Sequence, residues 1–151
     1  MYPPTAVPGL VPGPSKLSRS PGSFTLDDTT AIRATPGAGP AAALLRTLLA
    51  PATGLPLPLA PDGRIVLVLD PGLTGLGAEG YGLTVSGEAV LLRAAGAAGL
   101  RHGVQTIRQL LPVAALGAGP VRGVRWSVPG VEITDVPRYA WRGAMLDVAR
   151  H

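Results

Sequence analysis

The chain has 151 residues, of which 46% are hydrophobic and only 4% aromatic, and it carries a formal net charge of +4. This length supports one domain, whose core must come mainly from aliphatic side chains. The arginines are scattered singly, whereas nucleic-acid binding needs a basic stripe that neutralises several phosphates, so we predict no nucleic-acid partner.

The residue inventory also excludes several kinds of site. The chain has no cysteine and only two histidines, His102 and His151. Disulfides, thiolate chemistry and a histidine-built metal site are therefore excluded, and we expect no metal and no cofactor. No apolar run approaches the roughly 18 residues that span a bilayer, so we predict no membrane span. The first residues show no charged region followed by an apolar one, so no signal peptide is visible.

The first third of the chain predicts an extended arm, a strand and a helix. Residues 1–22 are rich in proline and indicate an extended arm. Residues 24–32 alternate apolar and polar side chains around a turn, which indicates strand structure. Residues 40–51 predict a helix, because Pro40 suits a first helical position and the leucines that follow form one stripe. We expect Pro51 to end this helix.

The middle of the chain predicts a buried strand, a hairpin and a second helix. "RIVLVLD", residues 64–70, is a continuous apolar run typical of a strand inside a sheet. Residues 81–94 alternate on both sides of a Ser-Gly-Glu turn, which predicts a β-hairpin. Residues 98–111 predict a helix, whose apolar stripe is Leu100, Val104, Ile107 and Leu111.

The last thirty residues predict two short strands after a flexible link. One strand is expected at 131–134 and a second in "GAMLDVA", residues 143–149. The order of elements predicts an α+β fold, a small sheet of about four strands with two helices on one face. We place the α+β domain at residues 23–121 and a linker with one further strand at residues 122–151.

Few residues by themselves point to chemistry. Asp147 lies in the terminal apolar strand and needs a partner, for which Arg142 and Arg150 are the candidates. An ion pair at a strand end is the simpler interpretation. His102 is expected to bond a backbone carbonyl rather than to act in catalysis. Asp27 and Asp28 predict an Asx turn rather than a catalytic pair. The residues alone indicate no reaction.

Two long segments nevertheless resemble a known enzyme family. "GYGLTVSGEAVLLRAAGAAGLRHGVQTIRQLLP" and "VPGVEITDVPRYAWRGAMLDVARH", together with the earlier "TGLPLP", are similar to β-N-acetylhexosaminidases of glycoside hydrolase family 20. The resemblance covers about residues 8–151. It implies a small accessory α+β domain followed by a (β/α)8 barrel, whose first strand has the form "RGAMLDVA". We therefore expect residues 122–151 to hold a linker and the start of an incomplete barrel.

The resemblance also implies roles for two arginines. Arg150, in "DVARH", matches the family's sugar-binding arginine, and a guanidinium can donate several fixed hydrogen bonds to sugar hydroxyls. Arg142, in "WRG", is expected to be structural, at the opposite end of the barrel strand from the active site. The family's substrates are glycans that end in N-acetylglucosamine or N-acetylgalactosamine, and its members are often secreted or extracytoplasmic.

The implied reaction is substrate-assisted retaining hydrolysis. The acetamido oxygen of the substrate is the nucleophile, a Glu is the general acid, and an adjacent Asp orients the acetamide. The chain contains no Asp-Glu dipeptide, so no catalytic residue carries over. The resemblance therefore implies the N-terminal part of a β-N-acetylhexosaminidase that is inactive alone.

A second hypothesis is a stand-alone, non-catalytic module that binds glycans or a partner protein. Such a module would use exposed aromatic side chains, and the candidates are Trp126, Trp141, Tyr81 and Tyr139. Tyr139 and Trp141 have a simpler role in the first hypothesis, in which they pack the small domain against the barrel. The residues from about 136 onward would otherwise expose an apolar strand with open edges.

Overall fold

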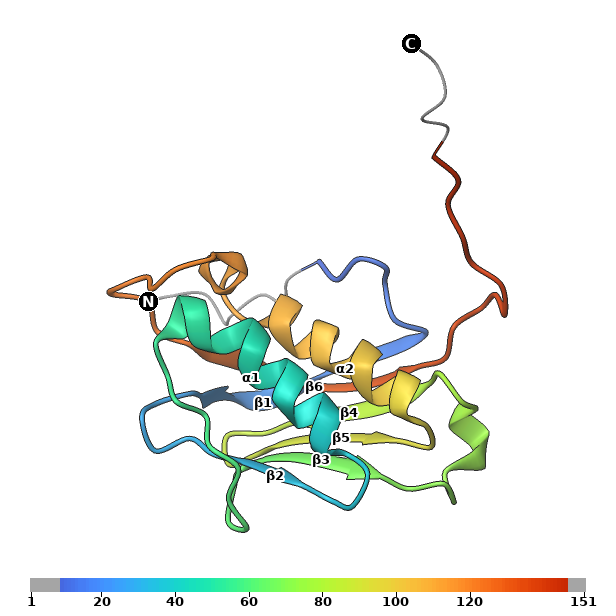
Figure 1. Cartoon of the computed structure of the whole chain (residues 1–151), viewed down its shortest axis with the longest axis horizontal. Coiled ribbons are helices and arrows are strands. Elements are labelled where there is room, and N and C mark those ends of the chain that lie inside the picture. The colour runs from blue at the N-terminus through green and yellow to red at the C-terminus, as the bar shows by residue number, and fades with distance from the viewer. Residues whose placement is uncertain (1–8, 147–151) are drawn as a thin grey trace.

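A computed structural model describes residues 9–146 and shows a six-stranded mixed sheet with both helices on one face (Figure 1). The strands are β1 (Lys16–Thr25), β2 (Ile32–Ala34), β3 (Ile65–Leu69), β4 (Tyr81–Val85), β5 (Val90–Ala94) and β6 (Ser127–Asp135). The helices are α1 (Gly39–Thr53) and α2 (Ala97–Leu110), with 3-10 turns η1 (Thr74–Leu76) and η2 (Val113–Leu116). The expected α+β fold with two helices on one face is confirmed.

The strand order explains why the helices share a face. The order is β1-β6-β4-β5-β3-β2, and β2, β3 and β5 run parallel while the remaining neighbours are antiparallel. Helix α1 connects β2 to β3, and α2 connects β5 to β6 across β4. Both connections move in the same direction along the sheet. Because such crossovers are right-handed, both helices must lie on the same side.

Helix α1 begins as expected and ends later than expected. It runs to Thr53, so Pro51 lies inside its last turn and does not end it. The stop is Gly54, whose φ of 70° is left-handed and whose amide donates to the carbonyl of Ala50. A proline so close to the end removes only one hydrogen bond from a turn whose termination the glycine already provides.

Helix α2 packs on the sheet as its stripe predicted. Leu100, Val104 and Ile107 are at most 1% exposed. Two glycines let the helix approach the strands closely. A Cβ on Gly99 would lie 2.1 Å from the carbonyl oxygen of Gly80, and one on Gly103 would lie 2.1 Å from Leu92. A side chain at position 99 would therefore force α2 away from the sheet, and one at position 103 would have to displace the buried Leu92 side chain.

The hairpin is also confirmed. β4 pairs with β5 in register from Tyr81–Ala94 to Val85–Val90, and the amide of Ser86 donates to the carbonyl of Ala89 across the turn. Buried residues alternate along both strands of the hairpin, and Leu92 and Ala94 among them lie against Gly103 and Gly99 of α2. The buried strand predicted at 64–70 is β3, which lies inside the sheet between β5 and β2.

The sheet is wider than expected, because it takes in residues from both flanking regions. β1 starts at Lys16, inside the stretch expected to be an arm. The strand expected at 131–134 is confirmed as part of β6, which is longer and lies in the region assigned to the linker. These two strands pair with each other antiparallel over most of their length. An edge strand with few buried residues has a weak local signal, which is why the proline-rich composition hid β1.

The expected barrel strand is not formed by the residues that the structure describes. Residues 136–146 contain no strand, and Met145 and Leu146 are 96% and 84% exposed. Figure 1 shows this segment leaving β6 and running away from the sheet. A strand needs a neighbour for its backbone hydrogen bonds, and none of the described residues supplies one here. None of the helices in the described part of the chain is long and apolar enough to cross a membrane.

Candidate functional site

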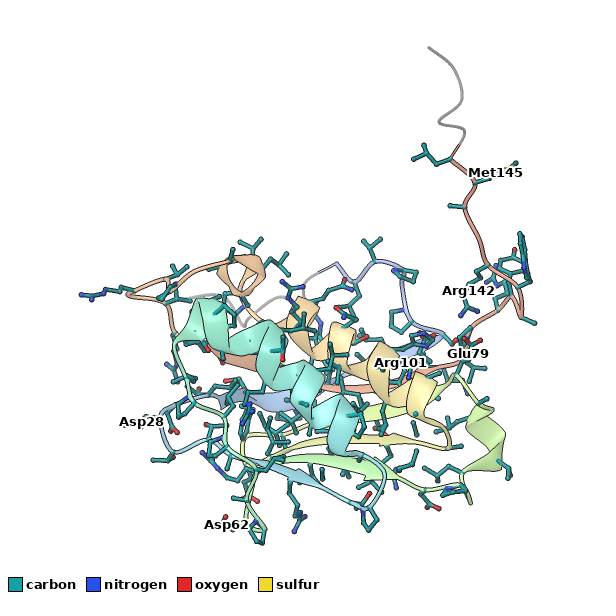
Figure 2. The ribbon with its side chains drawn as sticks, viewed as in Figure 1. Asp28, Asp62, Glu79, Arg101, Arg142 and Met145 are labelled. Carbon is teal, nitrogen blue, oxygen red and sulfur yellow. The ribbon has the colours of Figure 1, made fainter. Side chains whose placement is uncertain are left out.

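The most chemically organised part of the surface is the corner where the chain leaves β6. There Arg142 reaches back to Glu79, a residue 63 positions earlier in the chain, in the loop before β4 (Figure 2). Its Nη2 donates to Glu79 Oε1 at 2.8 Å and its Nη1 donates to Oε2 at 3.3 Å. The guanidinium thus meets both carboxylate oxygens, an arrangement that fixes direction as well as distance.

The loop that carries Glu79 is held in place from two sides. The backbone carbonyl of Glu79 lies 3.0 Å from Nδ1 of His102 on α2, and the amide of Gly80 donates to the carbonyl of Leu76. Gly80 also lies against β6, because a Cβ there would be 3.0 Å from the carbonyl oxygen of Asp135. The carboxylate of Glu79 therefore projects from a well-packed backbone.

A second polar cluster ties down the end of β6. Asp135 Oδ1 accepts from the amide of Ser15 at 2.9 Å and from its hydroxyl at 3.0 Å. The Ser15 hydroxyl oxygen in turn accepts from the amide of Val136 at 3.2 Å. The start of β1 and the end of β6 are thus joined just before the terminal segment begins.

The electrostatics of the corner favour a charged carboxylate. The hydrogen bond from Arg142 lowers the pKa of Glu79 below its ordinary value, and the charges of Arg142 and His102 add to this. Burial acts in the opposite direction and is outweighed. A carboxylate with a lowered pKa stays ionised and is poorly suited to act as a general acid. This pattern describes an ion pair rather than an acid catalyst.

On both sides of Arg142, the described chain presents large apolar side chains to solvent. Tyr139 is 65% exposed and Trp141 84% exposed, and Met145 and Leu146 follow them. Figure 2 shows Met145 far out along the segment, beyond Arg142. Large apolar side chains clustered within eight residues of an exposed segment are typical of a surface that contacts another protein unit.

The predicted site residues have different outcomes. Arg150, Asp147 and His151 lie outside the described residues. Among the described residues Arg142 forms its ion pair with Glu79, and the suggested pairing with Asp147 lies outside them. His102 bonds a backbone carbonyl, as predicted.

The predicted Asx turn is also confirmed. The amide of Thr29 donates to Asp27 Oδ1 at 3.0 Å. The neighbouring Thr30 hydroxyl bonds the same oxygen, so this carboxylate organises the loop before β2.

Sequence reasoning missed Glu79 and Ser15. Neither residue lies in a motif, and each acts on a partner more than 60 positions away. Glu79 stands in "GLGAEGYG", a glycine-rich stretch that did not fit a phosphate loop. A single acidic residue directly before Gly80 is the one local signal that could have suggested a fixed carboxylate.

No candidate metal site is found among residues 9–146. These residues contain no group of three or more His, Asp or Glu side chains that could hold a metal ion. A mainly apolar pocket lies at the C-terminal end of α2, beside Arg108, Leu111, Val113 and Leu116. The described residues that line it include no carboxylate and no imidazole.

Comparison with known proteins identifies the fold. A sequence model described as "Glycosyl hydrolase family 20, domain 2" matches residues 7–136, which include all six strands and both helices. The chain belongs to this family. The mixed sheet with two helices is the architecture that the family 20 domain shares with its solved neighbours.

Three relatives show how long this chain is compared with the proteins that it matches. The β-hexosaminidase of Porphyromonas gingivalis is 35% identical over 94% of this chain and 19% of its own length. The structure of the GH20 β-N-acetylhexosaminidase of Streptomyces coelicolor is 42% identical, with a TM-score of 0.83, over 91% of this chain and 28% of that one. A mutant Streptomyces plicatus β-hexosaminidase in complex with the product GlcNAc is 41% identical, with a TM-score of 0.88, over 100% of this chain and 30% of that one. The chain thus spans less than a third of these relatives.

Proposed function

We propose that this chain is the non-catalytic small domain, with the start of the catalytic region, of a β-N-acetylhexosaminidase that removes terminal N-acetylhexosamine from glycans. The observation that carries the proposal is the match to the Streptomyces plicatus enzyme, which covers the whole chain at 41% identity and was solved with GlcNAc. The expected boundaries were residues 23–121 for the small domain and 122–151 for the linker and barrel start. We propose a longer small domain and a shorter linker, because the sheet runs from Lys16 to Asp135.

Within this proposal, the family reaction is substrate-assisted retaining hydrolysis. The acetamido oxygen attacks the anomeric carbon, a Glu protonates the leaving oxygen, and an Asp orients the acetamide. The family resemblance implies that those two carboxylates lie later in the barrel, and this chain contains no Asp-Glu dipeptide. Arg150 is the one residue proposed to touch substrate, where its guanidinium would donate to sugar hydroxyls.

The energetics favour an inactive isolated chain. Hydrogen bonds to one charged group contribute about 1.5–3 kcal/mol each. Enzymatic rate enhancements require about 8 kcal/mol or more of transition-state stabilisation. One oriented arginine without an acid or a polarising carboxylate falls well short, so we expect no turnover.

Incubation of the purified chain with a chromogenic β-N-acetylglucosaminide tests the proposal. The expected result is hydrolysis equal to a buffer blank. Turnover that persists after repurification and in the variant Arg150→Ala would contradict the non-catalytic assignment, because the activity would then need a catalytic group within these residues.

A calorimetric titration with N-acetylglucosamine separates the glycan-binding alternative. Of the four aromatic side chains suggested for a sugar platform, Tyr81 and Trp126 are 3% and 6% exposed and are unavailable. Tyr139 and Trp141 are exposed, and in the proposal they contact the barrel region. We therefore expect no heat of binding. A saturable signal that disappears in Trp141→Ala would support the binding module instead.

A further inference from the structure

We propose that Arg142 and Glu79 form a positioning pair that fixes the direction in which residues 137–146 leave the small domain. The link from this direction to the substrate rests on the proposed function, because Arg150 lies eight residues after Arg142. The fixed direction itself rests only on the geometry of the corner.

The first argument is that the described segment has one hydrogen-bonded attachment. From residue 138 to residue 146 every residue is exposed. Up to Val136 the chain is held by β6 and by Ser15. After that point, the hydrogen bonds that join the described segment to the rest of the domain are the two from Arg142 to Glu79. A single guanidinium therefore controls how the segment departs.

The second argument concerns the shape of that attachment. Arg142 Nη1 also donates to the carbonyl of Tyr139, three residues earlier in the same segment. The guanidinium thus closes a turn within the segment and also binds the Glu79 carboxylate outside it. A planar fork that donates to both oxygens of a carboxylate restrains orientation, which a single ammonium group cannot do.

The third argument is that the acceptor is rigid. The backbone of Glu79 lies between α2 and the end of β6, where the carbonyl oxygen of Gly80 leaves no room for a Cβ on Gly99. An ion pair can hold a segment in one direction only if one partner is itself immobile. Here that partner is Glu79, whose backbone belongs to the packed sheet and helix.

The pair is a poor candidate for overall stability. The side chains of Arg142 and Glu79 are 44% and 37% exposed. Ion pairs that are exposed to this extent contribute little to folding, because water and salt screen them. A pair that orients a segment without stabilising the domain should therefore change the segment's geometry while leaving the unfolding temperature unchanged.

Distance measurement between two spin labels tests the proposal directly. The chain has no cysteine, so Thr47→Cys on α1 and Ala144→Cys in the segment give two unique labelling sites. We expect one narrow distance distribution in the starting protein. The variant Glu79→Gln should lose the narrow peak, as should the starting protein in high salt, with no change in unfolding temperature.

Two further variants serve as controls. Glu88→Gln removes the same charge from an exposed position in the hairpin turn and should leave the narrow peak intact. Arg142→Lys keeps the charge but cannot grip both carboxylate oxygens, so it should also lose the peak. A narrow peak in Glu79→Gln, or an already broad one in the starting protein, would overturn the positioning role. Neither result depends on turnover or sugar binding, so failure of the proposed function is recognised separately.

Discussion

The hydroxyl groups of Tyr81 and Thr106 lie 2.6 Å apart inside the domain and join β4 to α2. Tyr81 is 3% exposed and Thr106 8% exposed, so the bond is shielded from water. The Thr106 hydroxyl makes one other hydrogen bond within the described residues, a long one of 3.4 Å to the carbonyl of His102. This polar pair therefore lies where a helix packs on a sheet, and each hydroxyl depends on the other for its main hydrogen bond.

The variant Tyr81→Phe should destabilise the domain by about 1–2 kcal/mol, because it leaves the Thr106 hydroxyl buried with only its weak contact. Urea unfolding followed by circular dichroism measures the change. Tyr139→Phe is the matched control, since that ring is 65% exposed and its hydroxyl can bond water. Equal midpoints for the two variants would show that the buried bond contributes nothing.

The same tyrosine predicts a loss of stability at alkaline pH. Burial raises the pKa of Tyr81 above its ordinary value of 10.0, against an opposing effect of the Thr106 hydrogen bond. The folded state then holds its proton more tightly than the unfolded state. The resulting stability is complete below pH 10 and is lost as the pH rises toward the folded-state pKa. The unfolding free energy of Tyr81→Phe should fall less steeply over this range.

Gly99→Ala should be strongly destabilising although alanine is the better helix former. The added methyl group would meet the carbonyl oxygen of Gly80 at 2.1 Å, so α2 has to move away from the sheet. Overpacking of this kind costs about 1–3 kcal/mol. Gly39→Ala in α1 has open space around it and should be neutral or stabilising. Thermal unfolding of the two variants gives the comparison, and a tolerated Gly99→Ala would refute the close contact.

Asp27 should make stability depend on acidic pH. The hydrogen bond from the Thr29 hydroxyl leads the contacts that lower the pKa of Asp27 below 3.8. Stability from this carboxylate is therefore present above pH 3.8 and is lost as the pH falls through the folded-state pKa. The variant Asp27→Ala should unfold at lower urea than the starting protein at neutral pH.

The difference in unfolding midpoint between Asp27→Ala and the starting protein should be smaller at acidic pH, where the Asp27 carboxylate is protonated. Asp28→Ala, which removes the neighbouring exposed carboxylate, is the control and should match the starting protein at both pH values. A constant difference at neutral and acidic pH would show that the loop does not depend on the charge of Asp27.

Periodicity along the chain was a reliable guide to the elements in the middle of the domain. The stripe of α2, the hairpin and β3 were each predicted close to their observed bounds, because their buried residues repeat at the spacing of a helix or a strand. Pro51 shows the limit of a single-residue rule. A proline in the last turn removes little, so the helix ended at the left-handed Gly54 instead.

The sequence by itself determined which segments are helix or strand in this central part, and its motifs indicated the family. Only the tertiary structure decided that Lys16–Thr25 pairs with Ser127–Asp135 as an edge of the sheet, and that Arg142 meets Glu79. The physical reason is that helical and strand patterns arise from neighbouring residues that share one face. Edge pairing and ion pairs join segments far apart in the chain, and their partners are set by where the folded sheet places those segments.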